Sequence, residues 1–359
     1  MFYHIFFQYL SESISWMNVF KYQTFRAVVS FLTSFLIVLI LEPLFIRWLN
    51  ARGVKGQPIR DDGPKTHEVK RGTPTMGGIV IVGAVVISSV LWCDLTNRHV
   101  WFSMFVMVGY AYLGFLDDWS KVTKQTSTGL TERQKLIWQT GIAGVGVLCL
   151  VATGLPTEIT VPFTKGVVVP LGLLFVPFAI FVIVGTSNAV NLTDGLDGLA
   201  IGSVMTCAAT YAVFVYVAGH AEISKYLNIE HTAQVGELCI VLSAVVAGGL
   251  GFLWYNTYPA QVIMGDVGAL ALGGLLGYVA VIAKQELILI VAGGIFVIET
   301  LSVIIQRYSY KFRKKRVFKM APIHHHFELI GWPEPKIIVR FWIISIVLAL
   351  ISLSSLKIR

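Results

Sequence analysis

Charged residues are scarce in this sequence. Asp, Glu, Lys and Arg make up 13% of the 359 residues, while hydrophobic residues make up 55%. A soluble globular protein carries about 25% charged residues, so this composition excludes an ordinary soluble domain and a disordered or fibrous chain. A membrane-spanning helix needs about 20 apolar residues, and the length of the chain is therefore better counted in membrane crossings.

Cysteine and N-terminal basic residues are also scarce. The four cysteines lie in or beside apolar runs, and no two have the spacing of metal ligands, which disfavours a disulfide framework or a zinc site. Residues 1–20 contain no Lys or Arg, and Glu12 interrupts their apolar stretch. They do not fit a cleavable signal peptide, and their Phe, Tyr and Trp content predicts an interfacial or re-entrant amphipathic helix.

Ten apolar runs predict an all-α polytopic membrane protein with one integral membrane domain over residues 1–359. Backbone polar groups in lipid must be satisfied within the segment, so each run is expected to be a helix. The runs are 25–48, 76–93, 100–116, 136–155, 171–189, 199–218, 237–255, 267–283, 287–305 and 337–356. Within 156–170, β-branched residues around Lys165-Gly166 predict a short outer β-hairpin.

The connecting segments differ sharply in basic charge. The loops on the side reached after the first crossing hold 19 Lys and Arg, and the opposite side holds eight. They are 47–75, 117–135, 190–198, 256–266 and 306–336, the last rich in Lys, Arg and His. The positive-inside rule makes this side cytoplasmic and both termini periplasmic. The net charge of +8 therefore indicates topology and not a nucleic-acid partner.

Acidic residues gather at helix ends on the same side. Asp117 and Asp118 end the third predicted crossing, and if that helix continues, Lys121 shares their face. Carboxylates near the bilayer are costly, so a cluster needs a cation, a partner or a function. A carboxylate here is suited to accept a proton while a lysine holds an anionic substrate. The alternative is a solvated helix end with an ion pair.

A second polar cluster repeats every three residues, which predicts that helical turns align its side chains. Its members are Asn188, Asn191, Asp194 and Asp197. Gly195 and Gly198 permit a break in the helix. Carboxylate and amide oxygens suit Mg²⁺ or a nucleobase edge, whereas the alternative is a polar turn between two spans.

Three further segments carry polar side chains on this side. Asp266 begins the eighth crossing, either as a helix cap or as a Mg²⁺ ligand that needs further carboxylates and phosphates. His324, His325 and His326 cannot all point one way on a helix, which disfavours zinc and favours contact with a phosphate. Lys70 and Thr75 precede a helix N-terminus that favours anions. Together these features predict one inner-face site for a diphosphate with Mg²⁺.

Six segments resemble, in order and spacing, the motifs of the bacterial phospho-N-acetylmuramoyl-pentapeptide transferases. These are the lipid I synthases of the polyprenyl-phosphate N-acetylhexosamine-1-phosphate transferase superfamily. The segments are Gly72–Gly78, Phe115–Asp118, Asn188–Ala200, Gly251–Asn256, Met264–Gly268 and Ala321–Glu328. The resemblance runs from about residue 18 to the C-terminus.

This resemblance implies transfer of phospho-MurNAc-pentapeptide from UDP-MurNAc-pentapeptide to undecaprenyl phosphate, giving lipid I and UMP with Mg²⁺. It also implies ten spans, a homodimer in the bacterial inner membrane and a cytoplasmic active site. Asp266 resembles the Mg²⁺ ligand, and Asp117 resembles the residue that binds or deprotonates the lipid phosphate. The expected catalytic residues are Asp117, Asp118, Asp266 and His324.

The resemblance also assigns the substrate contacts. They are Lys70, Thr75, Lys121, Asn188, Asn191, Asp194, Gly195, Leu196, Asp197, Asn256, Ile263, Gln306, His325 and His326, with Lys135 as a further phosphate contact. One residue departs from the family pattern, since relatives carry Phe, which can stack on uracil, at the position of Ile263.

Two other functions stay open at this point. A sibling enzyme that uses UDP-N-acetylglucosamine shares the aspartate motifs, but the form of the segment Ala321–Glu328 favours the muramoyl enzyme. An ion-coupled transporter belongs to another class, and the confinement of most acidic residues to loops disfavours it.

Overall fold

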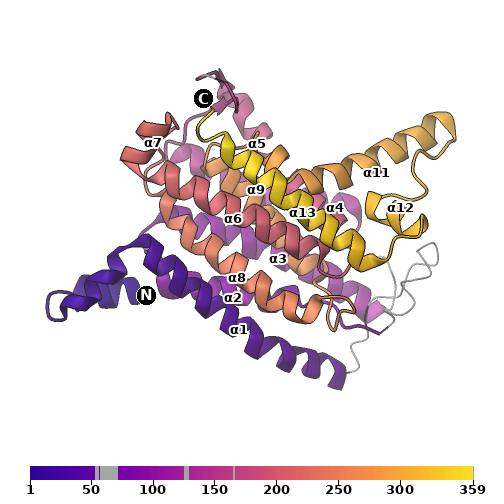
Figure 1. Cartoon of the computed structure of the whole chain (residues 1–359), viewed down its shortest axis with the longest axis horizontal. Coiled ribbons are helices and arrows are strands. Elements are labelled where there is room, and N and C mark those ends of the chain that lie inside the picture. The colour runs from indigo at the N-terminus through magenta and orange to yellow at the C-terminus, as the bar shows by residue number, and fades with distance from the viewer. Residues whose placement is uncertain (53–55, 57–71, 125–128, 165, 359) are drawn as a thin grey trace.

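The ten apolar runs all form helices in the computed structural model, which describes residues 1–359 except 53–55, 57–71, 125–128, 165 and 359. Among the described residues, eight helices are long and apolar enough to cross a membrane. They are α1 (Gln23–Ala51), α3 (Arg98–Lys124), α4 (Glu132–Ala152), α5 (Phe175–Thr193), α6 (Leu199–Gly219), α8 (Leu238–Asn256), α9 (Gly265–Ile282) and α13 (Glu334–Ser354). Figure 1 shows them as one bundle.

The other two runs form helices that are short or divided. Helix α2 (Gly78–Trp92) is apolar but has 15 residues. The ninth run is split at Gly293 into α10 (Leu289–Ala292) and α11 (Gly294–Arg313), because the paired glycines Gly293 and Gly294 interrupt the helix. Helix α11 carries on to Arg313, so the predicted loop 306–336 begins inside a helix and also contains α12 (Ile323–Leu329).

The segment between α4 and α5 forms the predicted β-hairpin. Strand β1 (Glu158–Thr160) pairs antiparallel with β2 (Val168–Pro170), with Ile159 opposite Val169. A single turn of 3₁₀-helix (Gly172–Leu174) follows and delays the start of α5 to Phe175. A short helix, α7 (Ala221–Leu227), and a 3₁₀ turn (Val235–Glu237) join α6 to α8.

Helix α9 forms the centre of the bundle, and every one of its residues is buried. Helices α3 and α5 pack along it, while α1 and α6 pack along α8. Gly273 and Gly277 allow this close packing, because a side chain at either position would lie within 2.8 Å of the α5 backbone. Small residues serve the same purpose between membrane helices in general. Asp266 lies in the first turn of this buried helix.

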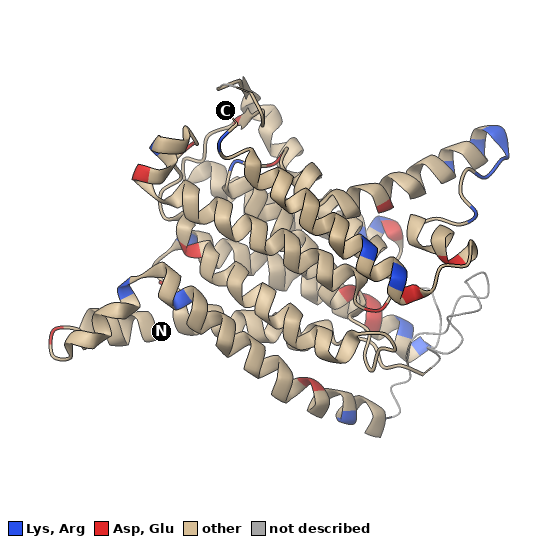
Figure 2. Cartoon of the chain, in the orientation of Figure 1, with Lys and Arg blue, Asp and Glu red and all other residues tan. Residues whose placement is uncertain are grey.

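Successive long helices run in opposite directions, so one end of the bundle collects the polar motifs. The end of α3 meets the start of α9 there, and the end of α5 leads into the start of α6. Figure 2 shows charged residues concentrated at this end. Both chain termini lie toward the other end (Figure 1).

Residues 1–21 form two short helices instead of the single amphipathic helix that the sequence predicted. They are a π-helix (Tyr3–Tyr9) and a 3₁₀-helix (Ser15–Lys21), separated by a polar turn. The rings of Phe2 and Phe20 pack on Trp92 at the end of α2, with centroids 5.1 and 6.0 Å away. The segment thus covers the end of α2, where the N-terminal amine also donates to the Val90 carbonyl over 2.6 Å.

A buried lysine joins the hairpin to the end of α9. Lys284 has a left-handed φ of 56° and no exposed surface. Its ammonium group donates to the carbonyls of Pro156, over 3.0 Å, and Glu158. It also lies 3.5 Å from the Glu286 carboxylate. Burial raises the pKa of Glu286 to about 7, against the lowering effect of this lysine.

We expect Lys284→Met to lower the free energy of unfolding by about 3–5 kcal/mol, because removing one partner of a buried ion pair leaves the other unpaired. The loss should be larger at pH 8 than at pH 6. Lys284 lowers the pKa of Glu286, which burial raises to about 7, so the folded pKa is higher still in the variant. The unfolded chain releases this proton more readily, and the variant therefore goes on losing stability as pH rises above about 7. Thermal unfolding in detergent measures both effects. The exposed Lys225→Met is the control, and equal melting temperatures for both variants would contradict the role of Lys284.

Candidate functional site

The end of α3 carries two buried aspartates and a lysine on one face. The helix continues to Lys124, so Asp117, Asp118 and Lys121 all lie within it. Both aspartates have no exposed surface. The Lys121 ammonium lies 2.7 Å from Asp117 Oδ2 and 3.6 Å from Asp118 Oδ1, which confirms the shared face predicted from the spacing.

Asp266 lies in the first turn of α9, opposite these aspartates. Asp118 Oδ2 accepts a hydrogen bond from the Val267 amide over 3.2 Å and so joins α3 to α9. Gly265 has φ +74°, and any side chain there would come within 2.5 Å of Asp118 Oδ2. A glycine is therefore required for the two helices to meet at this point.

The segment before α2 supports the same turn. The Ile263 amide donates to the Pro74 carbonyl over 2.9 Å, and the Gly77 amide donates to the Ile263 carbonyl over 3.0 Å. These bonds place Thr75 against Gly265, with its side chain fully buried. Ile263 itself is partly exposed, three residues before Asp266. Lys70, predicted from the same motif, lies outside the described residues.

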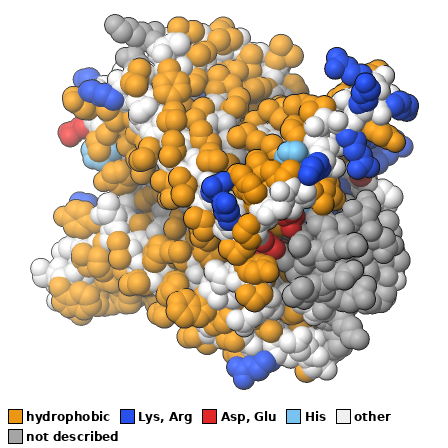
Figure 3. Space-filling model, turned by 45° about the vertical axis from the view of Figure 1, so that its right-hand side comes forward, with side chains coloured by type: hydrophobic (Ala, Val, Ile, Leu, Met, Phe, Trp, Pro, Cys, Tyr) orange, Lys and Arg blue, Asp and Glu red, His pale blue; other side chains and the backbone are white. Residues whose placement is uncertain are grey.

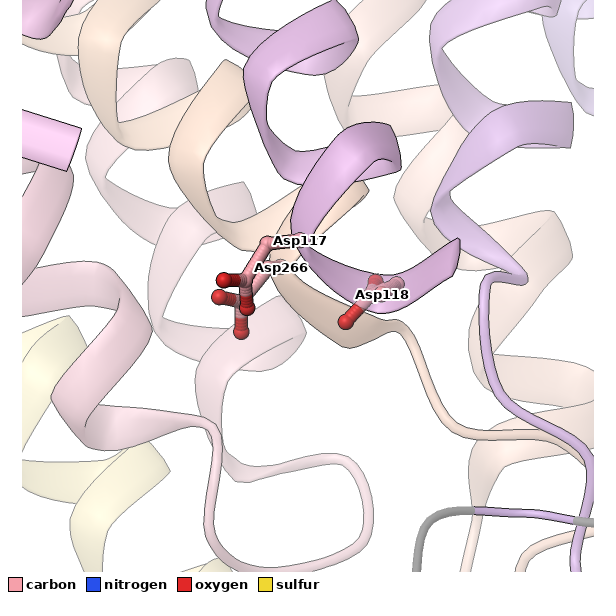
Figure 4. A group of neighbouring side chains, drawn as sticks. All are labelled: Asp117, Asp118 and Asp266. Carbon is pink, nitrogen blue, oxygen red and sulfur yellow. The ribbon is translucent and has the colours of Figure 1, made fainter. Parts of the chain in front are cut away.

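Asp117, Asp118 and Asp266 form one cluster (Figure 4). One oxygen of each lies within 4.8 Å of the others. Lys135, from the first turns of α4, lies 2.8 Å from Asp117 Oδ2 and 2.6 Å from Asp266 Oδ2. Lys121 lies 3.4 Å from Asp266 Oδ2. Two ammonium groups thus sit among three carboxylates contributed by two helices.

This donor set fits a divalent cation. Mg²⁺ prefers oxygen ligands and is usually bound by one or two carboxylates together with substrate phosphates. Both lysines can transfer their contacts from the carboxylates to an incoming phosphate. The cluster can therefore gather a metal ion and a diphosphate at one buried point.

The polar cluster between α5 and α6 has a different form from the one predicted. Helix α5 ends at Thr193, so the helical alignment holds for Asn188 and Asn191 but is wrong for Asp194 and Asp197. The break that the glycines predicted is present, with Gly198 at φ +81°. Asn188 points to α4, where its amide donates to Gln139 Oε1 over 2.8 Å.

Asp197 and Asn256 hold the loop that leads to Asp266. Asp197 Oδ2 accepts from the Ala260 amide over 3.0 Å. Asn256 accepts from the Gly198 amide over 2.9 Å and donates to the Val262 carbonyl over 2.8 Å. The break between α5 and α6 is thereby connected to the aspartate cluster through residues 257–264. Leu196 is buried in a small apolar cluster with α13.

Helix α12 presents His324 to this break. His324 is fully buried, and its Nδ1 lies 3.1 Å from the Glu299 carboxylate of α11. Gly195 lies against the other ring nitrogen, so closely that a side chain there would overlap it. His325 Nδ1 lies 2.7 Å from Glu328 Oε2. The His324 ring is therefore held between a carboxylate and the backbone of the break.

Two predicted contacts organise the loop before α12. Gln306 accepts from the Val317 and Phe318 amides, both over 3.0 Å, and donates to the Phe318 carbonyl over 2.9 Å. His326 Nδ1 accepts from the Lys319 amide over 3.1 Å. Both side chains thus close the segment 317–319 onto α11 and α12.

Sequence reasoning missed three residues of the site. Glu299 is an acid within the apolar run 287–305, but nothing near it in sequence indicates His324 as its partner. Gln139 and Glu334 gave no signal, although the Glu334 carboxylate accepts from the Asp197 amide over 2.9 Å. Each contact joins residues more than 20 positions apart, so it depends on how the helices pack and is not visible in the local sequence.

The chain matches a family model described as glycosyl transferase family 4 over residues 100–284. This stretch contains α3 to α9 and all three clustered aspartates. The helical bundle with candidate membrane spans and a buried carboxylate and lysine cluster thus defines a multi-pass membrane transferase.

Residues 70–82 match signature 1 of the phospho-N-acetylmuramoyl-pentapeptide-transferases. Proteins described by that name from Citrifermentans bemidjiense, Pelobacter propionicus and Geobacter sp. (strain M21) are each 53% identical to the chain over 360 residues, covering all of both sequences. The chain belongs to the phospho-N-acetylmuramoyl-pentapeptide-transferase family.

Proposed function

We propose that the protein transfers phospho-MurNAc-pentapeptide from UDP-MurNAc-pentapeptide to undecaprenyl phosphate, giving lipid I and UMP. The observation that carries this proposal is the buried cluster of three aspartates and two lysines, in a chain 53% identical over its full length to transferases of that name. In this reaction a phosphorus–oxygen bond to the lipid phosphate forms, and the bond to UMP breaks.

The membrane arrangement follows from the charge pattern. Helices α1, α2, α3, α4, α5, α6, α8, α9, the pair α10–α11, and α13 make ten crossings of one domain. The aspartate cluster lies at the end of the bundle that carries most Lys and Arg, and the positive-inside rule places that end in the cytoplasm. Both termini are then periplasmic, and the protein acts in the inner membrane as a homodimer.

Each cluster has a part in the transfer. Asp266, with Asp117 and Asp118, would hold Mg²⁺, which neutralises phosphate charge and positions the diphosphate. Lys121 and Lys135 bind phosphate oxygens, and Asp117 faces the acceptor phosphate. The donor contacts are assigned to the motif residues Lys70, Thr75, Asn188, Asn191, Asp194, Gly195, Leu196, Asp197, Asn256, Ile263, Gln306, His325 and His326, and His324 is assigned a catalytic role.

The test is to identify the lipid product by mass spectrometry. Purified protein in detergent is given undecaprenyl phosphate with either UDP-MurNAc-pentapeptide or UDP-N-acetylglucosamine. Lipid-linked phospho-MurNAc-pentapeptide from the first donor only is the expected result. A product from the second donor alone would assign the protein to the sibling enzymes, and no product from either donor by folded protein would refute the transferase.

Glu299 is expected to act through His324. We expect Glu299→Gln to lower kcat about tenfold or more, because the imidazole loses the charged partner that sets its orientation. A double-mutant cycle with His324→Ala measures the coupling. Once His324 is absent, the Glu299 substitution should add little further loss. Fully additive losses, in variants that keep the wild-type melting temperature, would show that Glu299 acts independently of His324.

A further inference from the structure

Helix α11 projects from the bundle (Figure 1), and its side chains form two unlike faces. One face exposes Leu301, Ile305, Tyr308 and Phe312, which are three or four residues apart. Such spacing forms a single apolar stripe on a helix. At 3.6 residues per turn, Val303, Arg307 and Tyr310 lie on the opposite side. When the stripe contacts lipid, this second face is turned toward water.

The second face borders a cavity of about 700 Å³, which shares only Gln306 with the residues assigned to the donor above. Its walls are α11 and the segment leading to α12. Four lining residues are cationic: Arg307, Lys311, Arg316 and Lys319. Among the residues that the structure describes, none that lines the cavity is acidic. Figure 3 shows basic side chains gathered on this projecting part of the protein.

Hydrogen bonds hold the segment that forms one wall of the cavity. Gln306 binds the backbone of Val317 and Phe318 through three hydrogen bonds. Lys319 is fixed at both ends, since its ammonium group donates to the Leu329 carbonyl over 3.0 Å and its amide donates to His326. Lys319 is thus held in place before any ligand arrives, and its bond to His326 connects the cavity to the histidine helix.

These features describe the ligand. It is anionic, because four cations surround the space, and it is partly apolar, because Val303, Met320 and Leu329 also line it. It is water-soluble, because the cavity lies on the side of α11 opposite the apolar stripe. The volume is in the range of pockets for drug-sized molecules, so it exceeds what a single phosphate needs.

We infer that this cavity binds the acidic peptide arm of the sugar-nucleotide donor. The inference rests on the proposed function, in which Lys121 and Lys135 already bind the phosphates. The peptide is the remaining part of the donor that carries carboxylates and apolar side chains together, and the connection to His326 places the cavity next to the residues assigned as donor contacts.

The test compares donor binding with and without the peptide. Calorimetry in detergent measures the Kd of UDP-MurNAc-pentapeptide and of UDP-MurNAc for wild type and for the triple variant Arg307→Gln, Lys311→Gln, Arg316→Gln. We expect the triple variant to bind the pentapeptide donor with a Kd about tenfold or more higher than that of wild type. Its Kd for UDP-MurNAc should equal that of wild type. The control is Arg313→Gln with Lys315→Gln, two exposed cations that do not line the cavity, and it should bind both donors normally.

Equal weakening for both donors would overturn the inference and move the basic groups to the nucleotide or diphosphate. Unchanged binding of both donors by the triple variant would also overturn it, as would equal weakening in the control. Failure of the proposed function is separately visible, because wild type would then form no lipid product. Calorimetry needs no turnover, so it still decides where the peptide binds.

Discussion

Asp266→Asn is expected to lower kcat about 10³-fold or more, without loss of folded protein. The carboxylate begins the buried first turn of α9 and lies within 4.8 Å of Asp117 and Asp118. An amide keeps the volume of the side chain but removes the charge that attracts Mg²⁺. Metal stabilisation of a transferring phosphate is worth several kcal/mol, and each 1.4 kcal/mol corresponds to about tenfold in rate.

Steady-state UMP release across a Mg²⁺ titration measures this effect. The variant should need far more Mg²⁺ for its residual activity than wild type. Glu132→Gln is the matched control, because it neutralises an exposed carboxylate at the start of a helix at the same end of the bundle. Near-normal kcat and Mg²⁺ dependence in Asp266→Asn would refute the metal assignment.

Asp117→Asn is expected to reduce turnover about 10³-fold while leaving the nucleotide donor bound. Asp117 has no exposed surface and contacts both Lys121 and Lys135. Its Oδ1 also accepts from the Leu130 amide over 2.7 Å. The Asp117 carboxylate therefore holds Lys121, Lys135 and the loop before α4 together. A side chain that accepts a proton from the reacting group contributes about 10²–10⁴ in rate, which sets the size of the expected loss.

Donor binding and turnover must be measured on the same Asp117→Asn preparation. Calorimetry with UDP-MurNAc-pentapeptide should give a Kd within a few-fold of wild type, while UMP release nearly disappears. Loss of donor binding in parallel with turnover would move Asp117 from the acceptor to the nucleotide pocket. A melting temperature below that of wild type would show that the variant loses turnover because its fold is destabilised.

The helices were largely predictable from the sequence, because lipid forces every apolar run to satisfy its own backbone. The limits of α3 were not. Its last turns carry Asp117, Asp118 and Lys121, so hydropathy placed the end near residue 116 whereas the helix continues to Lys124. The split at Gly293 was also missed, since the apolar run continues through it.

The site was predictable in its residues but not in their contacts. Lys121 was placed correctly because positions three and four apart share a helical face. Lys135 was expected only by resemblance, since α4 and α3 meet through tertiary packing. The predicted alignment of Asp194 and Asp197 was wrong because the glycines that permit a break also end the helix. Both residues therefore lie in the loop between α5 and α6, where helical spacing no longer aligns side chains.

We propose that the aspartate and lysine cluster transfers a phospho-sugar to a lipid phosphate with a divalent cation. UMP release by wild-type protein should be measured with UDP-MurNAc-pentapeptide, with and without undecaprenyl phosphate, in Mg²⁺ and in EDTA. UMP is expected only when the lipid and Mg²⁺ are both present. Lipid-dependent UMP at the same rate in EDTA would refute the role of the divalent cation.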